Sequence, residues 1–130
     1  MIEINNLTKE RVDKNFLESV AKKVLKGEDG EKGEVSIALV TSAEIKKLNK
    51  KYRGEDKPTD VLSFEGIGLG EIVICPSQVK KNAGKLNVGF KKELSRVLIH
   101  GILHLLGYNH EKKGKEAEKM EKKQNHYLLN

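Results

Sequence analysis

A long apolar helix is the feature that most constrains this fold. Residues 91–106 have helical spacing, and apolar side chains cover most of the helix circumference: Val97, Leu98, Ile99, Ile102, Leu103, Leu105 and Leu106. A helix that is apolar nearly all round must be covered by other elements. Gly107 follows directly, and glycine ends helices because it adopts the left-handed conformation without a Cβ penalty. We therefore expect a central, largely buried helix over residues 91–106.

Short strands supply the expected sheet. Residues 1–6 alternate Ile2 and Ile4 with polar side chains, as a half-buried strand does. Further strands are expected at residues 35–40, 61–64 and 71–75, and the glycine-rich residues 66–70 mark the turn between the last two.

Capping residues mark the other helices. Thr8 is the expected cap of the first, and Thr41 with Glu44 forms a capping box before the second. Pro76 opens a helix that runs to about residue 85, and a final helix is expected over residues 113–129. The apolar faces are Val12, Phe16, Val20 and Val24 in the first helix, Ile45, Leu48 and Tyr52 in the second, and Ala117, Met120, Gln124 and Leu128 in the last.

This order of elements predicts an α+β fold. We expect a single domain over residues 1–130, with a mixed β-sheet of about four strands and helices packed mainly on one face. The helix over residues 91–106 would lie at its centre.

Three of the four histidines have the spacing of a metal site: His100, His104 and His110. Residues four apart lie on one face of a helix, so His100 and His104 can direct their imidazoles at one point. The turn at Gly107 lets His110 approach from the opposite side, as in H-E-x-x-H-x-x-G-x-x-H metal hydrolases. We predict that the three bind one zinc ion per chain and leave a coordination position open for catalysis. Three unrelated histidines, two of them hydrogen-bonded in the core, are the alternative.

Gly101 departs from the pattern of those hydrolases. Their motif carries a glutamate at this position as the general base, so peptide hydrolysis by the usual route is not expected here. A glycine instead lets another backbone or a substrate approach the helix closely. The fourth histidine, His126, is expected on the surface of the last helix. Arg96 could line the metal pocket or pair with Glu93.

Arg53 is a second candidate for catalysis. It lies in the polar segment between two expected elements, and a guanidinium can bind phosphate through two parallel hydrogen bonds. An exposed arginine at the end of the preceding helix is the alternative. Four lysines close by form either an RNA-binding track or a solvated face: Lys46, Lys47, Lys50 and Lys51.

Composition narrows the class of protein. The net charge is +6, with 25 Lys and Arg against 19 Asp and Glu, which suits either a polyanionic partner or a highly charged soluble surface. We expect no membrane span and no secretory signal, because no apolar run of sufficient length is present. Cys75 is the one cysteine and cannot form an internal disulfide, so the cytoplasm is the expected location.

Three segments resemble the YbeY family of bacterial ribosomal RNA maturation factors. The first is H-G-I-L-H-L-L-G-Y-N-H, in which Asn109 replaces an aspartate of the family pattern. The second is Y-R-G-E-D-K-P-T-D-V-L-S-F, which begins at Tyr52. The third is L-G-E-I-V-I-C-P, in which Cys75 replaces the usual serine. Together they cover nearly the whole chain in order.

The resemblance implies a metal-dependent endoribonuclease that cuts single-stranded RNA in small-subunit ribosomal RNA processing and ribosome quality control. It places the metal ligands at His100, His104 and His110 and a functional arginine at Arg53, and it implies the ribosome or its small subunit as a partner. A zinc-dependent hydrolase of peptides, or a ribosome-associated binding module with a structural metal, remains an alternative. Cys75 is interpreted as structural rather than nucleophilic.

Overall fold

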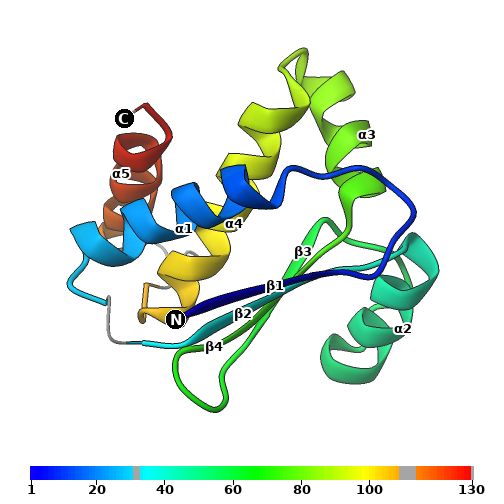
Figure 1. Cartoon of the computed structure of the whole chain (residues 1–130), viewed down its shortest axis with the longest axis horizontal. Coiled ribbons are helices and arrows are strands. Elements are labelled where there is room, and N and C mark those ends of the chain that lie inside the picture. Colours follow the sequence, from blue (N-terminus) through cyan, green and yellow to red (C-terminus); the bar gives the residue numbers. More distant parts are fainter. Residues whose placement is uncertain (31–32, 109–113, 130) are drawn as a thin grey trace.

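The computed structural model describes residues 1–30, 33–108 and 114–129. Over these residues the chain forms four strands and five helices (Figure 1). The strands are β1 (Ile2–Asn6), β2 (Val35–Leu39), β3 (Val61–Phe64) and β4 (Gly70–Ile74). The helices are α1 (Lys14–Gly27), α2 (Ser42–Arg53), α3 (Pro76–Leu86), α4 (Phe90–Leu105) and α5 (Lys115–Leu129).

The four strands form one mixed sheet in the order β1-β2-β4-β3. β1, β2 and β4 are parallel, and β3 pairs antiparallel with β4 at the edge. The register places Ile4 beside Ile37 and Ile37 beside Ile72, so alternate residues of neighbouring strands present one apolar face. The α+β prediction with a mixed sheet of about four strands is confirmed.

Helix α4 lies at the centre of the larger core, as its apolar sequence predicts. Leu98, Ile99 and Ile102 are fully buried, and they pack with the β2 and β4 side chains of one sheet face. α1, α3 and α5 all contact α4, so neighbouring helices cover the sides that the sheet does not. Figure 1 shows α1 and α4 on the same side of the sheet.

Helix α2 packs on the other face of the sheet (Figure 1). The hydrophobic core between α2 and the sheet is small and centres on Ile45, Leu62 and Val73. Helices therefore pack mainly on one face, as predicted. The prediction that Tyr52 belongs to the apolar face of α2 is wrong, because its side chain is 57% exposed. It lies in the last turn of the helix, where the ring packs edge-to-face on Phe64 of the edge strand β3.

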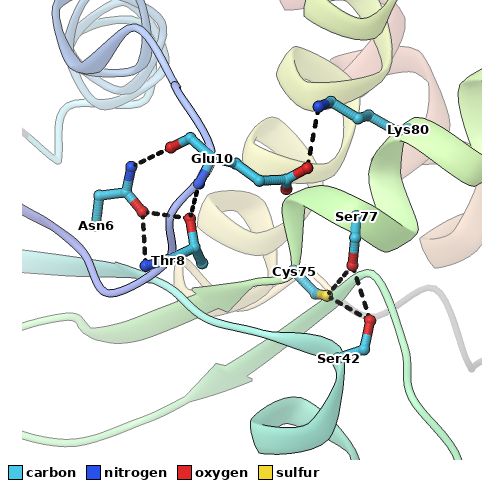
Figure 2. Close-up of polar contacts among 7 residues, drawn as sticks. All are labelled: Asn6, Thr8, Glu10, Ser42, Cys75, Ser77 and Lys80. Atoms are coloured by element: carbon cyan, nitrogen blue, oxygen red, sulfur yellow. Dashed lines mark hydrogen bonds and ion pairs between the residues drawn. The ribbon is translucent and has the colours of Figure 1, made fainter.

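The prediction that Thr8 caps the first helix is also wrong. Asp13 is the cap, and its carboxylate accepts a hydrogen bond from the Phe16 N–H at 3.0 Å. Thr8 instead bonds to Asn6 and to the Glu10 N–H, so residues 7–13 form an ordered loop (Figure 2). Thr41 does cap α2, as predicted, by accepting from the Glu44 N–H at 3.3 Å.

Over the residues described, none of the helices combines the length and apolar character that a membrane crossing requires.

Candidate functional site

His100 and His104 lie one turn apart in the last part of α4. Both are half-buried, and their ring centroids are 5.6 Å apart with an angle of 73° between the ring planes. The structure therefore brings two of the three predicted metal ligands together on one helix face. The surrounding core residues of α4 hold the backbone that carries them.

Gln124 of α5 orients the first of these rings. Its side-chain oxygen lies 2.9 Å from Nδ1 of His100, and it can accept a hydrogen bond from that nitrogen when the proton is there. This tautomer leaves Nε2 as the ring nitrogen with a lone pair for a metal. The sequence placed Gln124 in an apolar stripe without assigning it a role. An amide among apolar residues at helical spacing was the one signal that could have identified it.

The third predicted ligand, His110, lies outside the described residues, as does Asn109. Among residues 1–30, 33–108 and 114–129, no group of three His, Cys, Asp or Glu side chains could hold a metal ion. The described part of the candidate site thus offers two imidazoles, and the third predicted ligand lies outside it.

Gly107 turns the chain at the end of α4, as predicted. Its φ is +103°, and its N–H donates to the His104 carbonyl at 3.1 Å. The Tyr108 N–H donates to the Leu103 carbonyl, also at 3.1 Å, which completes the pattern of a glycine-ended helix. The chain therefore leaves α4 within one turn of the histidine pair.

The buried carboxylate of Glu28 holds the side chain of Tyr108, the residue that follows Gly107. Glu28, at the end of α1, accepts hydrogen bonds from the hydroxyls of Tyr108, at 2.6 Å, and Tyr127 of α5. Lys123 of α5 forms an ion pair with it at 3.2 Å. Burial and the bond to Glu28 raise the pKa of Tyr108 to about 12, so this hydroxyl stays protonated and donates. α1, α5 and the segment after α4 are joined at this carboxylate.

The packing around position 101 explains why this chain has a glycine where the peptidase motif has a glutamate. A Cβ at this position would lie 3.1 Å from Cγ2 of Ile72 and 3.2 Å from Oγ of Ser63. The Ser63 hydroxyl also donates to the Gly101 carbonyl at 3.4 Å. The glycine therefore lets α4 approach β3 and β4, and it does not open a path for substrate. A glutamate here would face the sheet, which argues against a peptidase of the usual kind.

Arg96 borders the same face of α4 one turn before His100. Its guanidinium binds both carboxylate oxygens of the buried Glu93, at 2.8 and 2.5 Å, and lies 3.9 Å from the Asp60 carboxylate. It also lines a cavity of about 260 Å³ between α4 and α5, together with His100 and Gln124. The predicted pairing of Arg96 with Glu93 is confirmed, and its guanidinium also lies beside His100 in this cavity.

A larger cavity, of about 600 Å³, lies at the opposite end of α4 beside Phe90 and Leu94. Phe90 is separated from His100 by about 15 Å along the helix, given a rise of about 1.5 Å per residue. Volume alone therefore does not select the site. The imidazole pair does, because it offers the ligands that zinc prefers.

Arg53 is the last residue of α2, and it is exposed. It lies at a helix end rather than in the loop that the sequence suggested. Helices α2 and α4 pack on opposite faces of the sheet, and both border the edge strand β3: Tyr52 contacts Phe64, while Gly101 contacts Ser63. Arg53 and the histidine pair therefore flank one strand from opposite faces.

The remaining residues singled out by sequence take structural or surface positions. Cys75 is fully buried, and its sulfur lies 3.3 Å from the Ser77 hydroxyl and 3.5 Å from that of Ser42 (Figure 2). This burial fits a structural residue. His126 is exposed and contacts the Tyr127 ring.

Comparison with known proteins identifies the family. The family model described as endoribonuclease YbeY matches residues 3–130. A relative of that name from Thermotoga maritima is 50% identical over 97 residues, which span 72% of this chain and 65% of the relative. One from Aquifex aeolicus is 40% identical over 129 residues, which span 94% of this chain and 86% of the relative.

A solved structure supports the same family assignment. The solution structure of a Thermotoga maritima protein is 41% identical to this chain and superposes with a TM-score of 0.72, covering 98% of this chain and 87% of that one. Sequence and fold thus point the same way, and the chain belongs to the endoribonuclease YbeY family.

Proposed function

We propose that this protein is a zinc-dependent endoribonuclease that cuts single-stranded RNA. The observation that carries the proposal is the pair His100 and His104, held side by side on a buried helix, with Gln124 on Nδ1 of His100. Relatives named endoribonuclease at 40–50% identity support the reaction class. The aligned stretch covers 65% of the Thermotoga maritima relative, so the activity is proposed for this chain rather than transferred to it.

The donor set fits zinc. His100 and His104 would hold the ion with His110, and three neutral imidazoles leave a coordination position for the reaction. Bound there, zinc would supply Lewis-acid activation at the phosphodiester. Gln124 holds the His100 ring in the orientation that presents Nε2, and a partner of this kind typically strengthens metal binding by about 10- to 100-fold.

Arg53 would bind the phosphate of the RNA strand. A guanidinium matches two phosphate oxygens with parallel hydrogen bonds, and its charge opposes the charge that develops as the phosphodiester reacts. Its exposed position at the end of α2 suits a polymer that approaches along the edge of the sheet.

The substrate proposed is the precursor of small-subunit ribosomal RNA, with the ribosome or its small subunit as partner, in maturation and quality control. The resemblance of three motifs to ribosomal RNA maturation factors supports this assignment, and the net charge of +6 suits a polyanionic substrate. A cytoplasmic location goes with it, because a chain whose one cysteine is buried and unpaired does not depend on an oxidising compartment.

Metal content and RNA cleavage, measured on the same samples, test the proposal. The protein should hold about one zinc per chain and cut single-stranded RNA, and a chelator should abolish cutting. His104→Ala should lose most of the metal, because two ligands rarely hold zinc tightly. His126→Ala is the matched control and should keep both metal and activity, since that side chain is exposed on α5.

Each alternative to the proposed function predicts a different experimental result. Full zinc occupancy in His104→Ala would contradict the three-histidine site. Cleavage of unstructured peptides with intact RNA would favour a peptidase. RNA binding without cleavage, in a protein whose stability falls when zinc is removed, would favour a binding module with a structural metal.

A further inference from the structure

An exposed tyrosine lies next to the candidate arginine. Among the residues that the structure describes, the strongly exposed large apolar side chains are Met1, Leu7, Tyr52, Ile67 and Leu86, and Tyr52 is the aromatic one. Tyr52 is 57% exposed at the end of α2, directly before Arg53. A single exposed apolar side chain is ordinary on a protein surface, so what distinguishes Tyr52 is an aromatic ring directly beside a candidate catalytic group.

The Tyr52 ring is held in place although it is exposed. It packs edge-to-face on Phe64 of β3, with ring centroids 5.1 Å apart and an angle of 64° between the planes. A ring supported in this way loses little conformational freedom on binding a ligand, because its orientation is already set. Phe64 itself joins the small core under α2. The tyrosine is therefore a preorganised surface group.

The charge around this ring is positive. The Lys51 ammonium lies over one face of the ring, 5.1 Å from its centroid, so a base would stack on the other face or displace this flexible side chain. Lys46, Lys47 and Lys50 are exposed on the same helix. Lys50 is partly neutralised by Asp56, at 3.8 Å. Arg53 adds a further cation at the helix end. An exposed aromatic ring bordered by cations is the combination that binds single-stranded nucleic acid, with bases on the ring and phosphates on the cations.

We propose that Tyr52 is a stacking platform for one base of a single-stranded RNA, and that Lys51 neutralises the adjacent phosphate. The inference rests on the proposed function, since it assigns the substrate contact beside Arg53. A base on Tyr52 would hold the next phosphate near that guanidinium. Bases inside a duplex already stack on one another and present no free face, so this contact favours single strands.

Single-turnover cleavage at increasing protein concentration tests the platform. Tyr52→Ala should raise the half-saturating concentration about tenfold, about 1.4 kcal/mol of binding, and leave the plateau rate within about twofold. Tyr52→Leu should behave like Tyr52→Ala, because it keeps apolar bulk without an aromatic face. Tyr52→Phe should remain within about twofold of the unmodified protein. Circular dichroism checks that each variant is folded.

Leu86→Ala is the matched control. Leu86 is 58% exposed at the end of α3, almost the same as Tyr52, and its loss should leave the half-saturating concentration unchanged. An equal rise in the Leu86→Ala and Tyr52→Ala proteins would overturn the platform. So would an unchanged half-saturating concentration in Tyr52→Ala.

A binding signal that does not need cleavage separates this inference from the proposed function. The chain has no tryptophan, so Tyr52→Trp introduces a single reporter at the platform. Its fluorescence should be quenched by single-stranded RNA and much less by a duplex of the same sequence. Quenching in a protein that cuts no RNA would defeat the proposed function and keep the platform. Cleavage with unchanged fluorescence would keep the function and defeat the platform.

Discussion

The two faces of the sheet carry different kinds of functional group. On the α4 face, the histidine pair is half-buried and backed by the larger core, and Gln124 orients the His100 ring. On the α2 face, Tyr52 and Arg53 lie in water at a helix end above a small core. Metal ligands need fixed geometry, whereas contacts to a long, flexible substrate need access. In the proposed function, the metal ligands would come from the interior of the fold and the substrate contacts from its edge.

The largest expected difference between the two faces is in stability. Leu98 of α4 is fully buried, and Leu98→Ala should lower the free energy of unfolding by about 3–4 kcal/mol because the packed core cannot refill the cavity. Leu48 of α2 is only partly buried, so Leu48→Ala should lower it by about 1 kcal/mol. Urea unfolding followed by circular dichroism measures both. Equal losses would mean that the two cores are equivalent.

Substitutions of Arg53 test whether the α2 face takes part in the chemical step. Arg53→Ala should slow single-turnover cleavage at saturating RNA by about 100-fold, as loss of one group that stabilises transition-state charge does. Arg53→Lys should recover little, because an ammonium lacks the planar fork. Metal content and stability should not change, since Arg53 lies at the surface.

Lys122→Glu is the control for the Arg53 experiment. Lys122 is exposed on α5, so its reversal should weaken RNA binding slightly and in a salt-dependent way, with the chemical step unchanged. Cleavage by Arg53→Ala at the unmodified rate would make Arg53 a surface residue and leave catalysis to the metal site alone.

Glu28 gives a smaller, pH-dependent effect on the α4 face. Burial alone would raise the pKa of this carboxyl, but hydrogen bonds from Tyr108, Tyr127 and Lys123 outweigh it, and the pKa lies below its ordinary value of 4.5. A lowered folded-state pKa stabilises the protein above about pH 4.5, and this stabilisation is lost as the pH falls through the folded-state value. Glu28→Gln should therefore destabilise by about 1–3 kcal/mol at neutral pH, and the difference should shrink in acid.

Unfolding free energies of both proteins between neutral and acidic pH measure this effect. Glu18→Gln is the control on the same helix, because Glu18 is half-exposed and its carboxylate forms an ion pair with the exposed Lys22. A difference between the Glu28→Gln and unmodified proteins that grew in acid would reverse the assigned sign.

The sequence predicted the buried face better than the exposed one. A continuous apolar pattern leaves one solution for α4, and the glycine after it fixes the helix end, so the histidine pair could be placed by spacing alone. The interpretation of Cys75 as structural also agrees with its burial.

At Tyr52, Thr8 and Gln124 the sequence was insufficient, for physical reasons that residue spacing alone does not show. Each outcome depends on a partner far along the chain or on a competing local bond. Tyr52 has the spacing of a core residue, but it lies at the end of α2 beyond the small core, where its ring contacts Phe64 and the Lys51 ammonium. Thr8 is a good cap, but Asn6 engages its hydroxyl and Asp13 caps the helix instead. Gln124 gains its role from His100, which is 24 residues away.

The mixed strand order also affects which strands can pair first when the chain folds. Each parallel pair closes a long stretch, as Ile2 pairs with Val35 and Val35 with Gly70, whereas Phe64 and Glu71 pair across a short turn. Loop closure over about 33 residues costs roughly 1.4 kcal/mol more chain entropy than closure over about seven. The β3–β4 hairpin is therefore the least costly part of the sheet to assemble. The strand that carries Ser63 and Phe64 can form before β1 and β2 have found their places.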